Sequence, residues 1–182
     1  IMMNELLNES DKASKHQMQE PITVFLSHLH HLLGDMYMDM SNAKIALSCY
    51  KKAYDFLKPI STEVEHTTVQ KKYEREGTFL LVKMGKTWLY TCEYSKVLKV
   101  LTKALEVFRD LNILDSPEYA FTLLQMGIFY RFMFQDELAH NMLNSALVIN
   151  EKNFGTNSEE VADTLHSKAH LLMDMGKLKV YN

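Results

Sequence analysis

One spacing of small and large apolar residues recurs three times along this 182-residue chain and constrains its fold more than any other feature. Each copy has a glycine, an aromatic residue three positions later, and apolar residues 12, 16 and 19 positions after the glycine. The copies are Gly34, Tyr37, Ala46, Tyr50 and Ala53; Gly85, Trp88, Val97, Leu101 and Ala104; and Gly127, Tyr130, Ala139, Leu143 and Ala146. A glycine inside a helix costs about 1 kcal/mol relative to alanine. A recurring one therefore indicates a neighbouring helix that lies too close for a side chain.

A fourth copy of this repeat frame begins near the end of the chain. Ala169 takes the glycine position, Leu172 takes the aromatic position, and the chain stops before a second helix of this unit is complete. The four anchors are separated by 51, 42 and 42 residues. A chain that opens with Ile and stops inside a unit is expected to be part of a longer protein.

The repeat frame resembles the tetratricopeptide repeat, whose unit is a pair of antiparallel helices. Units of 42 residues resemble those of the kinesin light chain, and the segment from Ala146 to Leu178 carries this likeness most closely. Its marks are Glu151-Lys152, Phe154-Gly155, Val161-Ala162, Thr164-Leu165 and Met175-Gly176-Lys177. The resemblance implies an all-α fold, a right-handed α-solenoid of antiparallel helix pairs.

The domain organisation follows from the same frame. Residues 1–20 are expected to be a linker or the end of a preceding helix, and residues 21–182 form the array. Its units cover about 21–60, 61–111, 116–154 and 158–182, the last incomplete. Pro21 can start the first helix, along which apolar residues follow helical spacing. These are Ile22, Phe25, Leu26, Leu29, Leu32 and Leu33.

Capping residues predict where the later helices begin and end. Asn42 starts a helix that Pro59 stops after Leu57, and Thr62 with Glu65 forms a capping box. We expect one long helix over about 62–91, with a polar first half that projects beyond the stack. Further helices are expected over 93–110, from the strong Ser116-Pro117-Glu118 start signal to about 134, from an Asp136 cap to 154, and from Ser158 to 176.

Composition excludes several classes of function. The net charge is −3, so no diffuse basic field favours nucleic acid. No apolar run is long enough to cross a membrane. The two cysteines, Cys49 and Cys92, have neither metal nor redox spacing and are interpreted as reduced, partly buried thiols of a cytosolic protein.

The histidines are the strongest candidates for chemistry, and they do not complete a site. His28 and His31 are three residues apart, and His166 and His170 are four apart, spacings at which two side chains on a helix can share a metal. A third ligand is not evident near either pair, so we interpret them as polar residues on helix faces. No nucleophile motif or phosphate-binding loop is found, and we predict no catalytic residues, no metal site and no cofactor.

The resemblance also implies where a partner binds, because the first helices of successive repeats line a concave groove. The non-core positions of those helices are His31, Asp35, Met38 and Asp39 in the first unit; Val82, Lys86, Leu89 and Tyr90 in the second; Leu124, Ile128, Arg131 and Phe132 in the third; and His166, His170, Met173 and Asp174 in the fourth. Apolar members of this set can equally pack on neighbouring helices. Asp35 and Val82 occupy positions where carboxylate-binding repeats have Asn and Lys, which argues against a receptor for a C-terminal carboxylate.

We therefore expect a non-catalytic scaffold or adaptor that binds a protein segment with apolar anchors and some acidic character. By resemblance it belongs in the cytoplasm, in a cytoskeletal, motor or ciliary assembly. Two alternatives remain open: a regulatory sensor whose superhelix responds to a peptide, and a structural spacer that self-associates or binds a filament. The charged segment over 62–76 is a second candidate contact surface.

Overall fold

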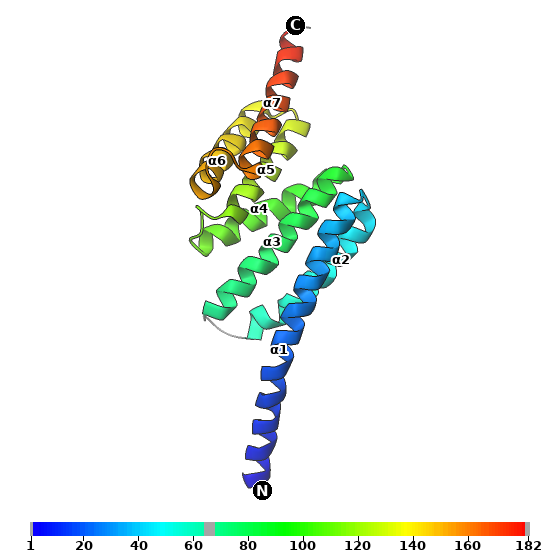
Figure 1. Cartoon of the computed structure of the whole chain (residues 1–182), viewed down its shortest axis with the longest axis vertical. Helices are drawn as coiled ribbons and strands as arrows, with labels where there is room; N and C mark the ends of the chain where they lie inside the picture. Colours follow the sequence, from blue (N-terminus) through cyan, green and yellow to red (C-terminus); the bar gives the residue numbers. More distant parts are fainter. Residues whose placement is uncertain (1, 64–67, 181–182) are drawn as a thin grey trace. The chain divides into compact units, whose positions relative to one another are not determined.

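The computed structural model describes the backbone of residues 2–63 and 68–180, and the side chains of residues 21–59 and 68–176. The described residues form helices and short connections, without strands (Figure 1). They divide into two compact units, Ile1–Leu80 and Leu81–Asn182, and α3 crosses the boundary. Each unit is described by itself.

The first unit contains α1 (Met2–Asp39), α2 (Ala43–Glu63) and the first part of α3 (Thr68–Tyr90). Helix α1 packs against α2, and its N-terminal half continues beyond α2, as the blue ribbon in Figure 1 shows. Ser27 of α1 is buried and donates a hydrogen bond to the backbone carbonyl of Ala53 in α2, at 2.9 Å. This bond fixes the pairing of the two helices next to an Ala53 that is itself fully buried.

The second unit contains the end of α3, then α4 (Tyr94–Asp110), α5 (Pro117–Phe132), α6 (Asp136–Phe154) and α7 (Glu159–Val180). One core cluster joins Val82 and Leu89 of α3 to residues of α4 and α5, including Leu101 and Phe129. A second joins α5 and α6 to Leu171 of α7. The core thus runs along the stack of helices, as expected for repeated units that bury their faces against one another.

The repeat frame is confirmed by close contacts between paired helices. A Cβ built on Gly34 would lie 2.4 Å from the Tyr50 ring, on Gly85 2.9 Å from Leu101, and on Gly127 2.6 Å from Leu143. In each unit the side chain in contact is the one 16 positions after the glycine. The residues 12 and 19 positions after it are all fully buried; they are Ala46, Ala53, Val97, Ala104, Ala139 and Ala146.

The first helix of each unit ends in the same turn. Ser41, Cys92 and Phe134, each seven residues after the glycine, have φ values of 58°, 60° and 57°. The amide of the next residue donates to a carbonyl five residues earlier, at 2.7, 2.8 and 2.9 Å in the three units. This is the Schellman ending of a helix, which normally favours glycine at the left-handed position. Cys92 is exposed here, not partly buried as expected.

Two of the three prolines that were expected at helix boundaries, Pro21 and Pro59, lie inside helices, whereas Pro117 begins α5 as predicted. Helix α1 begins before Pro21, and α2 continues through Pro59 to Glu63. Thr62 therefore belongs to the last turn of α2 and does not cap α3, while Glu65 lies outside the described residues. A proline removes one backbone hydrogen bond from a helix without always ending it, and local composition did not reveal that these helices continue.

Three of the predicted helix starts are confirmed by side-chain capping bonds. Asn42 Oδ1 accepts from the Ile45 amide at 3.3 Å, and Ser116 Oγ accepts from the Tyr119 amide at 3.2 Å. Ser158 likewise accepts from the Val161 amide at 3.3 Å. Asp136 is the first residue of α6 and makes no cap, and α7 continues beyond Gly176 to Val180.

The polar start of α3 does not project freely as predicted. Tyr73, Gly77 and Thr78 are buried within the first unit, and the backbone of Gly77 packs beside the ring of Tyr54. The other side chains of this stretch are exposed or half-buried, and the exposed ones are Thr68, Val69, Lys71, Lys72 and Glu74. Among the described residues, no helix combines the length and apolar character that crossing a membrane requires.

Candidate functional site

The predicted groove residues of the first unit form a half-buried polar contact between α1 and α2. Asp35 Oδ1 accepts a hydrogen bond of 2.7 Å from the Tyr50 hydroxyl, and Asp35 Oδ2 lies 3.5 Å from His31 Nε2. The pKa of the Tyr50 hydroxyl is raised well above its ordinary value, mainly because the side chain is buried and secondly because it donates this bond to Asp35. Met38 is half-buried and Asp39 is exposed. His31 and Asp35 therefore already serve the packing of the first unit.

Three of the predicted groove residues are core residues, which corrects their assignment. Val82 is fully buried, Leu89 is 6% exposed and Leu124 is 5% exposed. Val82 and Leu89 belong to the cluster between α3, α4 and α5, and Leu124 to the cluster between α5, α6 and α7. These side chains pack on neighbouring helices, because other helices cover the face of α3 or α5 on which they lie. Helical spacing alone had left this alternative open.

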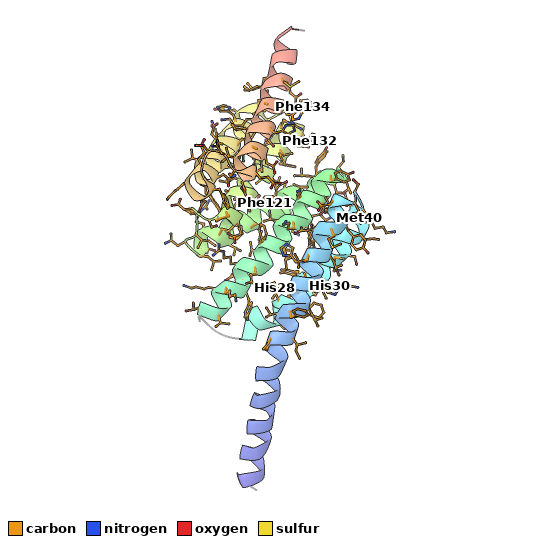
Figure 2. All side chains as sticks on the ribbon, viewed as in Figure 1. His28, His30, Met40, Phe121, Phe132 and Phe134 are labelled. Carbon is orange, nitrogen blue, oxygen red and sulfur yellow. The ribbon has the colours of Figure 1, made fainter. Side chains whose placement is uncertain are left out.

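The remaining predicted α3 positions of the second unit, Lys86 and Tyr90, are exposed, and the half-buried Lys83 lies beside Lys86. Lys86 and Lys83 lie on successive turns, and their ammonium groups stand 5.8 and 5.5 Å from the centre of the Phe121 ring of α5. Cations at this distance over an aromatic face are attracted by the ring quadrupole. Tyr90 follows on the same face and is 60% exposed. Figure 2 shows Phe121 on α5 and Phe132 and Phe134 near its end.

The predicted positions of α5 and α7 contact each other through charge. Arg131 Nε lies 3.8 Å from Asp174 Oδ2. The Arg131 side chain is 16% exposed, and its Nε makes no hydrogen bond in the described part of the chain. The guanidinium also stands 4.9 Å from the centre of the Phe132 ring. The Phe132 ring in turn lies 6.0 Å from the ring of Tyr94 in α4, measured between centroids. This arginine combines a buried, incompletely satisfied donor with an acidic neighbour.

Helix α7 carries three polar side chains on successive turns of one face: His166, His170 and Asp174. His166 Nε2 and His170 Nε2 are 3.0 Å apart, and Asp174 continues the four-residue spacing of these histidines. Met173 beside them is 56% exposed, and Ile128 of α5 is half-buried. Among the residues that the structure describes, no group of three His, Cys, Asp or Glu side chains could hold a metal ion.

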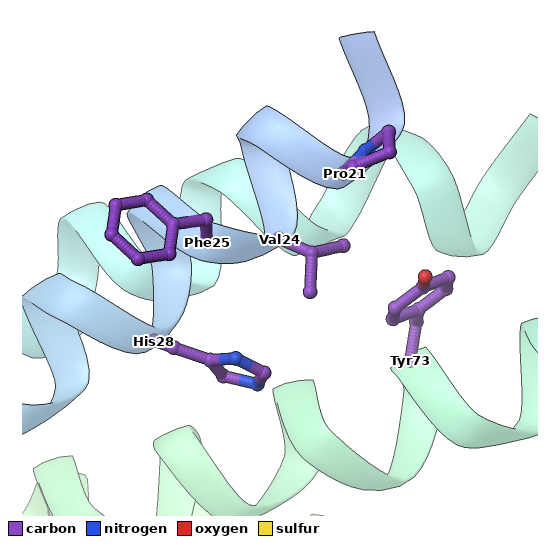
Figure 3. A pocket seen from close by; sticks show the side chains of 5 residues that line it. All are labelled: Pro21, Val24, Phe25, His28 and Tyr73. Carbon is purple, nitrogen blue, oxygen red and sulfur yellow. The ribbon is translucent and has the colours of Figure 1, made fainter. Parts of the chain in front are cut away.

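Two further histidines of the first unit, His28 and His30, make separate contacts. His28 Nε2 lies 3.5 Å from Glu76 Oε2 of α3, whereas the His30 ring stacks on Phe56 of α2 with centroids 5.7 Å apart. Figure 3 shows His28 with Val24 on the side of α1 near Tyr73, where they line a shallow hollow together with Pro21 and Phe25.

Two relevant features were missed by the sequence analysis. Lys83 and Phe121 belong to the basic and aromatic contact between α3 and α5, which helical spacing alone could not pair. Asn150 is 3% exposed and donates to Thr164 Oγ1 at 3.1 Å and to the Glu160 carbonyl at 3.3 Å, joining α6 to α7. A signal existed for Asn150, because it stands 23 positions after the glycine, where the other units bury Leu57 and Phe108.

We name one set of residues in the second unit the first-helix surface, because α3, α5 and α7 are the first helices of successive repeats. It consists of Lys83, Lys86, Phe121, Arg131, His170 and Asp174. The cation–π contacts join α3 to α5, and the Arg131–Asp174 pair joins α5 to α7. The structure thus links side chains of three successive repeats by two pairwise contacts, one cation–aromatic and one ionic.

Comparison with known proteins supports the fold and goes no further. No family model and no curated protein matches the sequence. The crystal structure of BtubC from P. vanneervenii, a kinesin light chain-like tetratricopeptide protein, is similar with a TM-score of 0.68 at 16% identity, over 91% of this chain and 62% of that chain. The C-terminal tetratricopeptide domain of a Plasmodium falciparum protein described as FK506-binding is similar with a TM-score of 0.60 at 16% identity, over 88% of this chain and 95% of that chain.

This chain therefore spans about 62% of the length of BtubC. Both similar structures contain tetratricopeptide repeats. The repeat frame of this chain agrees with that fold, because a glycine on the first helix of each pair meets a large side chain 16 positions later on the second helix. The chain has the tetratricopeptide fold, an all-α solenoid of antiparallel helix pairs.

Proposed function

We propose that this protein is a non-catalytic interaction scaffold that binds an acidic segment of a partner protein on the first-helix surface. The observation that carries the proposal is the arrangement around Arg131 and Phe121. Two lysines of α3 lie beside the Phe121 ring of α5, and the buried Arg131 Nε of α5 makes no hydrogen bond in the described part of the chain.

A carboxylate is the group that best matches this surface. A guanidinium presents several donors in one plane and binds carboxylates in a defined geometry. Asp174 lies near Arg131 at 3.8 Å, beyond hydrogen-bond distance, and is itself half-exposed. An acidic side chain of a partner could approach the same guanidinium, while Lys83 and Lys86 would attract further negative charge and Phe121 would offer apolar area.

The first-helix surface is preformed by helix packing, so binding requires little ordering of this chain. Charges at such a surface mainly determine which partner binds and how fast it associates. The cytoskeletal, motor or ciliary setting rests on the likeness to light-chain repeats alone, and we propose it only as the first place to look for partners.

The test is a selection of binding peptides from a displayed library, followed by titration of selected peptides by fluorescence anisotropy. Lys83→Glu/Lys86→Glu reverses two charges of the first-helix surface. Lys99→Glu/Lys103→Glu makes the same change of charge on exposed positions of α4 and is the matched control. We expect the first variant to weaken acidic peptides about tenfold or more, roughly 1.4 kcal/mol, and the control less than about twofold.

Equal binding by the two lysine variants would refute the site. Arg131 needs a different variant, because its side chain is largely buried and a glutamate there would face Asp174. Arg131→Glu/Asp174→Lys keeps an ion pair in place with the charges exchanged. Retained thermal stability with lost peptide binding would assign the arginine to recognition, whereas unchanged binding would assign it to packing alone.

A further inference from the structure

Helix α1 leaves large apolar side chains exposed on the side opposite to α2. Five large apolar side chains along it and one in the turn that directly follows are exposed, by 59, 66, 42, 61, 58 and 70%, and we call them the α1 stripe: Ile22, Phe25, Leu29, Leu32, Met36 and Met40. At 100° per residue they lie within about 80° of the helix circumference. Ser27 and Gly34, which face α2, lie on the opposite side.

Four of these residues belong to the apolar series with helical spacing in the sequence, and the structure leaves all four exposed. A helix at the surface of a globular protein normally turns polar residues outward and its apolar face toward a neighbouring helix. Here α2 covers only one side. Taking roughly 200 Å² for each large side chain, the α1 stripe exposes on the order of 700 Å², more than the largest apolar patch of a typical monomer.

We propose that the α1 stripe is a self-association surface, on which α1 of a second copy of this chain packs in the antiparallel direction. The stripe is self-complementary: its positions from Ile22 to Met36 are apolar at alternating three- and four-residue spacing, as in a two-helix interface. Two stripes packed together would remove on the order of 1,000–1,400 Å² from solvent, at the lower end of the range for specific interfaces.

The residues on either side of the stripe favour the antiparallel direction. His28 and Asp35 border it on the side near α3, and the half-buried Leu26 and Leu33 border it on the other. Parallel helices would place His28 and Asp35 against the leucine border of the other copy. Antiparallel helices place like borders together, so that His28 lies near Asp35 of the partner subunit and the leucine borders extend the apolar contact.

Sedimentation equilibrium of the whole chain over a range of concentrations tests the self-association. We expect a monomer–dimer equilibrium with a dimer of twice the monomer mass. Leu29→Glu/Leu32→Glu should raise the dimer dissociation constant by at least about tenfold, with unchanged helicity by circular dichroism. Val148→Glu changes an α6 side chain that is 64% exposed and outside the stripe, and this control should remain a dimer.

Disulfide trapping tests the direction. In the Cys92→Ser background, with buried Cys49 retained, Leu29→Cys and Leu32→Cys are prepared separately and mixed. Antiparallel packing places Leu29 opposite Leu32 of the partner subunit, so the mixture should oxidise to a mixed dimer faster than either variant alone.

Several results would overturn the proposal. A wild-type chain that stays monomeric at every concentration would exclude a second copy as the occupant of the stripe, and so would the formation of large polydisperse aggregates. A glutamate variant that still dimerises would place the interface elsewhere. Faster oxidation of Leu29→Cys alone would exclude the antiparallel arrangement. The α1 stripe shares no residue with the first-helix surface, so these outcomes and those of the peptide experiment are independent.

Discussion

Alanine substitutions at the helical glycines separate the effect of a close neighbour from that of helix propensity. At Gly34 a new Cβ would lie 2.4 Å from Tyr50 Cε1, and at Gly127 2.6 Å from Leu143 Cγ. At Gly77 the nearest atom, in the Tyr54 ring, is 3.7 Å away, an ordinary van der Waals distance. The same substitution is therefore overpacked at the first two positions and accommodated at the third.

The expected magnitudes combine two opposing terms. Alanine gains up to about 1 kcal/mol over glycine in a helix interior, whereas overpacking costs about 1–3 kcal/mol. Gly77→Ala should thus stabilise the chain by about 0.5–1 kcal/mol. Gly127→Ala should destabilise it by about 1–2 kcal/mol, because the Leu143 atom in the way is a branch carbon. Gly34→Ala should behave similarly, because the hydrogen bond to Asp35 holds the Tyr50 ring in place.

Gly85 supplies an intermediate case. The nearest atom to its built Cβ is Leu101 Cδ2 at 2.9 Å, the end of a side chain that can rotate, with Val100 Cγ1 at 3.0 Å. The two terms should nearly cancel there, leaving a change of about 0.5 kcal/mol or less.

Urea denaturation followed by circular dichroism measures the series, with Gly77→Ala as the matched control. The predicted order of stability is Gly77→Ala, wild type or Gly85→Ala, then Gly34→Ala and Gly127→Ala. If Gly127→Ala and Gly34→Ala were as stable as Gly77→Ala, the paired helices would not lie close enough to exclude a Cβ, and the physical reason for the repeat frame would be wrong.

Three further predictions address single residues. Phe134→Gly should stabilise the chain by about 1 kcal/mol in thermal denaturation, since an exposed residue at φ 57° ends α5 where glycine is unstrained; a loss of stability would contradict this. Burial and the bond to Asp35 raise the pKa of the Tyr50 hydroxyl, so the unfolded chain loses its proton first. The free energy of unfolding should then fall as pH rises above about 10, less steeply in Tyr50→Phe; identical slopes in urea titrations would refute it. Asn150→Ala should destabilise the α6–α7 contact by about 1–3 kcal/mol, seen as faster hydrogen exchange of α7 amides, with unchanged exchange as the contrary result.

Much of the fold could be predicted because the repeat frame is local in sequence. The residues 12, 16 and 19 positions after each glycine lie on the facing helix of the same unit, joined by one short turn. The small Ala46 and Ala53 and the large Tyr50 therefore describe one contact by themselves. Start signals such as Ser116 are equally local, because a side-chain oxygen accepts from an amide three residues later.

The candidate site could be predicted only in part, because spacing shows that a face is apolar or polar and does not show what covers it. Lys86, Arg131 and Asp174 remain at or near the surface, whereas Val82 and Leu124 were removed from it by helices from two sides. The partner of Arg131 could not be found either, since Asp174 is 43 positions away and meets it only through the packing of α5 on α7.

The sequence by itself determined the helix pairs and their close contacts, because small and large residues recur at fixed offsets within each unit. Only the tertiary structure decided that α1 and α2 continue through Pro21 and Pro59, and which apolar faces are covered. The same three- and four-residue spacing that is buried in α5 is left open along Ile22 to Met40. Burial depends on which helix packs alongside, and that is a property of the assembled stack, not of any one helix.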